Sequence, residues 1–156
     1  MADIAADGPF SAFPGVGRWF VVLSGTGVSL TFSEGEREVR AEDPPLRFEG
    51  GAAPGCRLLD GPTRDLNLML RDSSGVMEQV QPGVAWGPGL VHRGLFTAVA
   101  GRWSRAGEVR RLDAHSLLWE DVSDAGDWRF ESDDPGARVS GWWLGLSPLH
   151  VPVQVR

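Results

Sequence analysis

The amino-acid sequence predicts an all-β protein built as an antiparallel β-sandwich or barrel with few or no long helices. The 156 residues include 21 glycines and 11 prolines, and helix-interrupting residues at this density leave little room for long helices. Apolar and β-branched residues fall instead into many short runs. Gly and Pro punctuate the gaps between these runs, which is typical of antiparallel sheets rather than of alternating strands and helices.

The first predicted element is a hairpin. Residues 18–24 and 28–32 are rich in β-branched and aromatic side chains, and a Gly-Thr-Gly turn at 25–27 joins them. In the second run, apolar side chains alternate with Ser29 and Thr31, which gives that strand one dry face and one wetter face. We therefore expect the hairpin to bury one side against a core.

Shorter runs follow the hairpin. A turn at 42–45 precedes an apolar return at 46–48, and a second turn rich in Gly and Pro leads to 56–59. The chain breaks again at 61–62, ahead of residues 64–70, which show the most regular alternation in the protein. All of these runs have the length of strands rather than of helices.

The second half continues with runs of the same kind and without a clear sequence repeat. Gly and Pro again fill the gaps between them. The strands predicted here lie within residues 76–80, 90–100, 108–112, 115–120, 128–131 and 139–146.

Composition excludes several classes of function. Hydrophobic residues make up 42% of the chain and charged residues 23%, which is normal for a globular domain. The formal net charge is −6, and this acidic excess argues against nucleic acid as a partner, because phosphate contacts need clustered Lys or Arg. All 15 basic residues are arginines, so chemistry that depends on a lysine is excluded.

The compartment is predicted from the cysteine and from the N-terminal residues. Cys56 is the only cysteine, so it can form no internal disulfide and supply no multi-cysteine metal site. The N-terminal ten residues lack the basic and apolar regions of a signal peptide, and no window approaches 18 uninterrupted apolar residues. We expect a cytoplasmic protein without a membrane partner.

Catalytic and metal-binding motifs are missing. None of His92, His115 and His150 lies two, three or four residues from another, so the His-x-His pair of a metal-binding cupin is absent and no metal is predicted. There is no Gly-x-Ser-x-Gly nucleophile elbow. The short glycine pairs lack the third glycine and the helix of a phosphate-binding loop, so no cofactor is predicted either.

The most specific polar feature lies in residues 61–67. Asn67 is the only asparagine in the chain, and on a strand it shares one face with Asp65, whereas Arg64 points to the other face. A buried polar group without a partner costs about 1–3 kcal/mol, so this face needs internal partners or a ligand. The alternative is that Arg64 and Asp65 only tie down neighbouring loops.

A second candidate is the loop at 8–15 together with Arg18. Its Gly and Pro residues fix an irregular path. Phe10 and Phe13 would then form the wall of a pocket. The alternative is that these aromatic rings plug the end of a sheet.

Three segments resemble the HutD/Ves family of small cupin-like bacterial proteins, of which one branch is associated with histidine utilisation. They are residues 3–15 with Arg18, 23–30 and 58–69. The resemblance implies one metal-free double-cupin domain over 1–156, with packed halves at about 1–85 and 86–156. Family members usually begin with a further N-terminal segment that carries a Trp-Lys-Asn-Gly-Gly-Gly type motif, so we expect the natural protein to be longer.

The function implied by the resemblance is non-catalytic binding of a small carboxylate. The expected ligand is an intermediate of histidine catabolism, namely urocanate, formiminoglutamate or formylglutamate. An arginine fork would hold the carboxylate and an amide would read the polar end. Strict alternation puts Arg64 and Asn67 on opposite faces, so both reach one cavity only if a bulge or twist intervenes. The candidate ligand-binding residues are Arg64 and Asn67 first, then Arg18 as an alternate anchor, Phe10 and Phe13 as the wall, and Asp65 and Ser11.

Two other functions stay open. The first is a metal-independent isomerase or lyase of the cupin type that uses His115 or a carboxylate as its base. The second is a stress-response protein of the Ves type without a ligand. The oligomeric state, including a homodimer, is left open as well.

Overall fold

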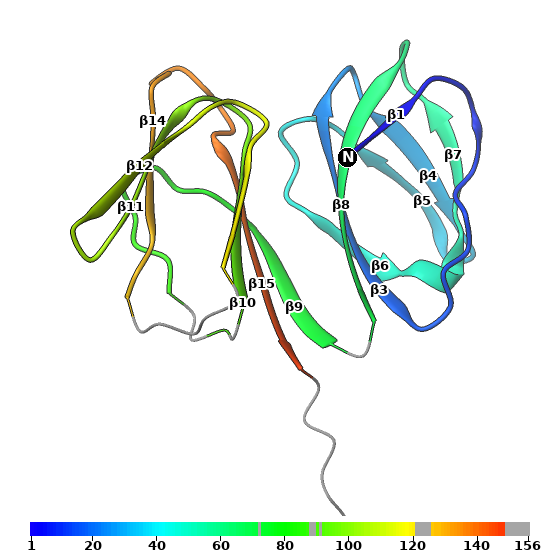
Figure 1. Ribbon diagram of the computed structural model, residues 1–156. Coiled ribbons are helices and arrows are strands. Elements are labelled where there is room, and N and C mark those ends of the chain that lie inside the picture. The colour runs from blue at the N-terminus through cyan, green and yellow to red at the C-terminus, as the bar shows by residue number, and fades with distance from the viewer. Residues whose placement is uncertain (72, 88–89, 91, 121–125, 149–156) are drawn as a thin grey trace, which may run out of the picture.

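The predicted all-β class is confirmed. The structure is a computed structural model that describes residues 1–71, 73–87, 90, 92–120 and 126–148. In these residues there are fifteen strands and one short 3-10 helix, η1 (Gly50–Ala52). All strand pairs are antiparallel, and they form two double-layered halves that lie side by side (Figure 1).

Eight strands build the first half. One sheet has the order β1-β8-β3-β6, and the other has the order β2-β7-β4-β5. The first sheet contains β1 (Ala2–Ile4), β8 (Thr63–Arg71), β3 (Val16–Ser24) and β6 (Leu46–Glu49). The second contains β2 (Gly8–Pro9), β7 (Gly55–Leu58), β4 (Val28–Phe32) and β5 (Gly35–Val39).

The second half repeats this topology. Its larger sheet has the order β13-β10-β15-β9, which matches β6-β3-β8-β1, and its smaller sheet has the order β12-β11-β14. The larger sheet contains β13 (Leu117–Glu120), β10 (His92–Thr97), β15 (Gly141–Pro148) and β9 (Ser73–Gln79). The smaller sheet contains β12 (Glu108–Leu112), β11 (Gly101–Arg105) and β14 (Arg129–Ser132). The chain passes from one set of sheets to the other between β8 and β9, earlier than the expected boundary near residue 85.

The predicted hairpin of residues 18–24 and 28–32 is wrong. The turn at 25–27 does join the two strands, but β3 pairs with β6 and β8 in one sheet while β4 pairs with β5 and β7 in the other, so the chain crosses between sheets here. Glycine is still required at this turn. Gly25 and Gly27 have φ values of 94° and 119°, a region that residues with a side chain avoid. A side chain at Gly27 would also collide with the carbonyl oxygen of Val39 on β5. The turn therefore brings β4 close to its neighbour only because the residue there has no Cβ.

Each half has its own core, and a third core joins them. Inside the first half, Phe20, Val22 and Leu30 are fully buried. Inside the second half the core is rich in tryptophan. The shared core contains Trp19, Val21 and Leu66 from the first half and Met77, Phe96, Trp142 and Leu144 from the second.

Strand β3 is the wall between the first interior and the shared core. Its residues alternate, so Trp19 and Val21 pack toward the second half while Phe20 and Val22 pack into the first half. Arg18 lies on the same face as Phe20. This alternation carries a charged side chain into the interior of the first half, where Arg18 is only 7% exposed.

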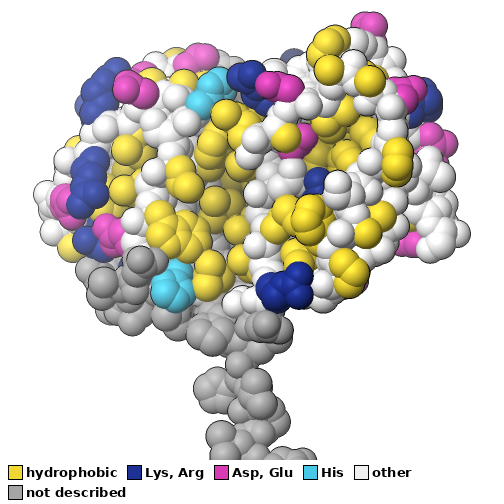
Figure 2. Space-filling view, turned by 45° about the vertical axis from the view of Figure 1, so that its right-hand side comes forward, with side chains coloured by type: hydrophobic (Ala, Val, Ile, Leu, Met, Phe, Trp, Pro, Cys, Tyr) yellow, Lys and Arg dark blue, Asp and Glu magenta, His cyan; other side chains and the backbone are white. Residues whose placement is uncertain are grey.

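The surface is divided by side-chain type. Figure 2 shows hydrophobic side chains gathered along the middle of one face, with many of the charged side chains toward its margins. Among the described residues there is no helix with the length and apolar character needed to span a lipid bilayer.

Candidate functional site

The candidate site is a polar cluster inside the first half, formed by Arg18, Asn67 and Asp65. Strands β3 and β8 are paired so that Phe20 lies opposite Asn67 and Val22 lies opposite Asp65. Because alternate residues of a strand share a face, these two polar side chains enter the same interior as Arg18. The sequence-based prediction that Asp65 and Asn67 share a face is confirmed.

The three side chains form a chain of hydrogen bonds. Nε of Arg18 donates to Oδ1 of Asn67 at 2.6 Å. Nδ2 of Asn67 in turn donates to Oδ1 of Asp65. The amide is thus oriented by a cation at one end and a carboxylate at the other. Asn67 therefore links the two charged side chains and gives each of them a hydrogen-bond partner.

Arg18 lies close to two aromatic rings. Its guanidinium carbon lies 4.3 Å from the ring centroid of Phe10 and 5.3 Å from that of Phe48. Burial lowers the pKa of Arg18, an effect that the negative charge of Asp65 opposes, and the guanidinium stays charged. Its bond to Asn67 uses Nε, and the two terminal nitrogens donate to none of the described residues. Within the described residues, the hydrogen bonding of Arg18 is therefore limited to its Nε.

Asp65 is a buried carboxyl group with unusual acidity. It is only 2% exposed, and burial raises its pKa to about 6, against the opposing effects of Arg18 and of the hydrogen bond from Asn67. Desolvation disfavours the charged form of a carboxyl group. Asp65 therefore changes its charge close to neutral pH, and only the Asn67 amide separates it from the cation of Arg18 along the chain of hydrogen bonds.

Arg64, a first-ranked anchor in the sequence analysis, lies elsewhere. It turns outward, where its Nε donates to Oδ1 of Asp3 at 2.6 Å and its side chain is 43% exposed. A bulge does occur opposite this segment, between Val22 and Ser24 of β3, but it does not bring Arg64 inside. The expectation that Arg64 and Asn67 share a cavity is thus corrected: the arginine beside Asn67 is Arg18.

The residues of the 8–15 loop divide between the interior and the surface. Phe10 packs against Phe20 and stands over Arg18, as expected of a wall. Phe13 is 38% exposed, its amide donates to the carbonyl of Gly50 at 2.9 Å, and no described contact joins it to Arg18. Ser11 is exposed as well. Of the three, only Phe10 belongs to the cluster.

Sequence reasoning missed two neighbours of Arg18. Phe48 lies opposite Arg18 across the β3–β6 pair, and no pattern in the sequence shows which strands are paired. Cys56 is buried in the same core. Burial raises the pKa of its thiol, and the charges of Asp7 and Asp65 add to this effect, so the thiol stays protonated at neutral pH.

His115, the candidate base of the enzymatic alternative, lies apart from the polar cluster, and His150 lies outside the described residues. His115 is exposed in a turn with a φ of 58°, and its amide donates to the carbonyl of Thr97 at 2.8 Å. It belongs to the second half, whereas the polar cluster lies in the first. In the described segments of the chain, no group of three or more His, Cys, Asp or Glu side chains comes together as a metal site.

Solved structures share this fold. A conserved protein of unknown function from Pseudomonas aeruginosa is 28% identical, with a TM-score of 0.83 over 94% of this chain and 80% of that chain. HutD from Pseudomonas fluorescens, in its formate condition, is 25% identical, with a TM-score of 0.76 over 94% and 76%. YhaK from Escherichia coli is 14% identical with a TM-score of 0.60, over 93% and 82%, and is similar in fold alone.

These comparisons place the fold among cupin-like proteins. No curated protein matches the chain. The HutD family model matches residues 1–137, a span that contains β1 to β14 and every member of the polar cluster. The chain therefore belongs to the HutD family.

Proposed function

We propose that this protein acts in histidine utilisation as a cytoplasmic, non-catalytic binding protein for a carboxylate-bearing intermediate, such as urocanate, formiminoglutamate or formylglutamate. Membership of the HutD family supports the pathway. The similar HutD from Pseudomonas fluorescens is described in a formate condition, and formate is the smallest carboxylate. The polar cluster of the first half supports the chemistry of the ligand.

The observation that carries the proposal is the terminal fork of Arg18. A guanidinium and a carboxylate match each other through two parallel, charge-assisted hydrogen bonds. Nε is already used by Asn67, which fixes the plane of the fork. The ring centroids of Phe10 and Phe48 lie 4.3 and 5.3 Å from its guanidinium carbon, and Arg18 is only 7% exposed. Such desolvation strengthens the attraction for an anion.

Asn67 and Asp65 act as positioning residues in this proposal. Both polar ends of the Asn67 amide are occupied within the cluster, so its role is to aim Arg18 rather than to contact the ligand. Asp65 balances the charge of Arg18 while the site is empty. When an anion arrives, a proton on Asp65 removes the repulsion between two negative groups. Ligand binding is then coupled to proton uptake.

One observation favours the enzymatic alternative. A carboxyl group with a pKa of about 6 has the acidity of a general base near neutral pH, and Asp65 is such a group. An isomerase or lyase would use it to move a proton on a substrate held by Arg18. Asp65 already accepts a hydrogen bond from Asn67, which is the reason we place binding first.

Calorimetry with the three acids tests the proposal. We expect heat of binding without product for one of them, and a loss of at least tenfold in affinity in Arg18→Gln. Arg64→Gln is the matched control, since it removes an arginine that pairs with Asp3 on the outside.

The outcomes separate the three functions. Product formation that Asp65→Asn abolishes would establish the enzyme. If none of the three acids gives heat of binding, the binding proposal is contradicted and a Ves-type stress-response protein without a ligand is favoured. Equal affinity in the wild type and Arg18→Gln would remove Arg18 from the site.

A further inference from the structure

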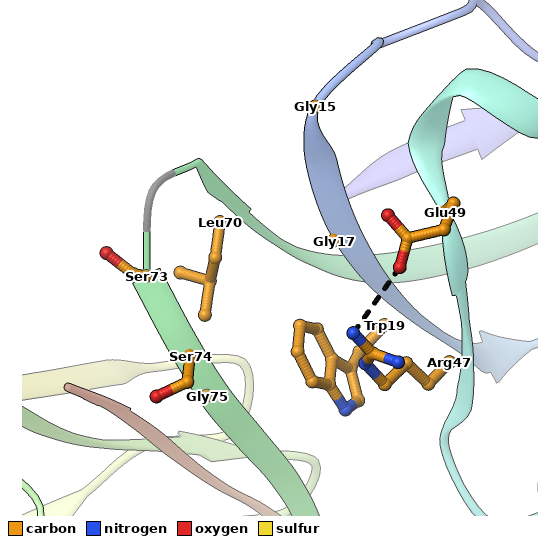
Figure 3. Close-up of a pocket in the computed structure, with 9 residues that line it drawn as sticks. All are labelled: Gly15, Gly17, Trp19, Arg47, Glu49, Leu70, Ser73, Ser74 and Gly75. Atoms are coloured by element: carbon orange, nitrogen blue, oxygen red, sulfur yellow. Dashed lines mark hydrogen bonds and ion pairs between the residues drawn. The ribbon is translucent and has the colours of Figure 1, made fainter. Parts of the chain in front are cut away.

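A cleft of about 430 Å³ lies where the two halves meet. Figure 3 shows it between the paired strands β3 and β6 on one side and β9 on the other. It lies on the opposite face of β3 from the polar cluster, because it is lined by Gly17 and Trp19 rather than by Arg18. Its volume is within the range of small-molecule sites.

Two cross-strand pairs form one wall of the cleft. Trp19 lies opposite Arg47, and Gly17 lies opposite Glu49. The guanidinium carbon of Arg47 stands 5.1 Å from the Trp19 ring centroid. The Nη2 atom of Arg47 lies 3.4 Å from Oε1 of Glu49. A cation, an anion and an indole are thus presented side by side.

Gly17 provides the space. A Cβ on this residue would meet the Trp19 ring at 3.5 Å and the Arg47 guanidinium at 3.9 Å, so its missing side chain leaves a gap between them. Leu70 of β8, which lies opposite Gly17, adds an apolar group. The far wall is Ser73, Ser74 and Gly75 of β9, with the two serine side chains turned away from Trp19 (Figure 3).

The ion pair between Arg47 and Glu49 is long and exposed to solvent. The Arg47 and Glu49 side chains are 59% and 68% exposed, and one long contact joins them. An exposed pair of this kind contributes little to stability. Each group is therefore able to exchange its present partner for a ligand of the opposite charge.

We propose that this cleft binds a small zwitterion, an α-amino acid with a planar or apolar side chain. Its carboxylate pairs with Arg47 in a bidentate contact, and its ammonium group pairs with Glu49. Its side chain lies over Gly17, against the edge of Trp19 and the side chain of Leu70. A simple carboxylate satisfies only half of this arrangement, so the cleft differs from the Arg18 site in the ligand that it selects.

Titration calorimetry with L-phenylalanine as the probe tests this inference. We expect weak binding, with a dissociation constant on the order of 1 mM. Two analogues dissect it: 3-phenylpropionate lacks the ammonium group, and phenethylamine lacks the carboxylate. Each is expected to bind at least tenfold more weakly than L-phenylalanine.

Substitutions locate the binding. Gly17→Leu fills the gap and is expected to abolish binding, while Gly17→Ala weakens it. Glu49→Gln should remove the preference for L-phenylalanine over 3-phenylpropionate, and Arg47→Gln should remove the preference over phenethylamine. Arg40→Gln is the matched control, because Arg40 is an exposed arginine paired with Glu38 at 2.8 Å outside the cleft. Where Gly17→Leu does not fold, the two charge variants decide.

The inference fails if L-phenylalanine does not bind to the wild type, or if the analogues bind equally well. It also fails if Arg18→Gln rather than Arg47→Gln removes binding, since the ligand would then occupy the first half. This test is independent of the test of the proposed function, because the two use different ligands and different variants. The three pathway acids are tested with Arg18→Gln, whereas L-phenylalanine is tested with Arg47→Gln and Glu49→Gln.

Discussion

At the scale of single residues, the cluster places two opposite charges in one interior and joins them by an amide. Arg18 and Asp65 are 7% and 2% exposed. Buried charges are costly unless they are paired and hydrogen-bonded. Removal of either charge therefore changes the energy of the other. Burial raises the pKa of Asp65 more than Arg18 lowers it.

Asp65→Asn should change how stability depends on pH. The pKa of Asp65 in the folded protein is about 6, above its usual value of 3.8, so the folded state binds the proton more tightly than the unfolded state. The stabilisation is present below about pH 4 and is lost as the pH rises through 6, by roughly 3 kcal/mol at most. Urea unfolding of both proteins at pH 4.5 and 7.5 measures this contribution.

The variant lacks this titration, so the difference in unfolding free energy between wild type and Asp65→Asn should shift in favour of the variant at the higher pH. A difference that stays constant between the two pH values would show that Asp65 does not titrate in this range.

Carboxylate binding should depend on the same proton. With Asp65 protonated, an anion at Arg18 faces no opposing charge, so affinity should increase about three- to tenfold from pH 7.5 to pH 5.5. Calorimetry with formate in two buffers of different ionisation heat also detects the proton taken up. Asp65→Asn should bind with an affinity that does not change over this range, and a wild type that behaves like the variant would refute the coupling.

The sequence predicted part of this cluster. Asp65 and Asn67 were identified because they alternate on one strand, and alternation assigns the faces of a single strand. It does not assign the facing residues of the neighbouring strand. The position of Arg18 beside Asn67 and of Phe48 opposite Arg18 therefore cannot be predicted from the sequence. Alternation does place Arg64 on the face opposite Asn67, and the structure agrees.

At the scale of elements, glycines decide where strands approach one another. The turn between β3 and β4 has Gly27 at a φ of 119°, packed against the carbonyl of Val39. Here the conformation and the space both demand glycine. The Gly-Thr-Gly pattern predicts a turn, and the turn is present. The pattern does not show that the chain crosses from one sheet to the other at this turn, nor that Gly27 contacts β5, because both depend on the pairing of distant strands.

Gly27→Ala should separate these two demands when it is compared with Gly107→Ala. Gly107 has a φ of 88° with no atom within 4 Å of an added Cβ, so its substitution costs only backbone strain, about 1 kcal/mol. Gly27→Ala adds the collision with Val39 and should cost about 3 kcal/mol or more. Equal losses in urea unfolding would show that β4 and β5 are not in close contact at this turn.

At the scale of the whole molecule, one topology occurs twice with different interiors. In the first half Asn67 lies opposite Phe20, and in the corresponding strand pair of the second half Trp143 lies opposite Leu95. The second interior is filled by indole rings, whereas the first holds the polar cluster. The sequence does not show this repeat, because sheet order is preserved while residue types are not. The difference explains why the proposed carboxylate site belongs to the first half.

The shared core should make the halves unfold together. Trp142 is 2% exposed and packs with residues of both halves. Trp142→Ala should destabilise the protein by about 3–5 kcal/mol, and the wild type should unfold in one transition. Tryptophan fluorescence reports mainly on the second half, and labelling of the buried Cys56 reports on the first. Separate midpoints for the two signals would show that the halves are independent.

The central claim is that Arg18 holds a carboxylate inside the first half, and a crystal structure of the protein with formylglutamate tests it most directly. The account predicts a carboxylate in bidentate contact with the terminal nitrogens of Arg18, at about 2.7–2.9 Å, with the bond to Asn67 retained. A ligand bound at Arg64 or Arg47 instead, with the Arg18 fork in contact only with water, would contradict it.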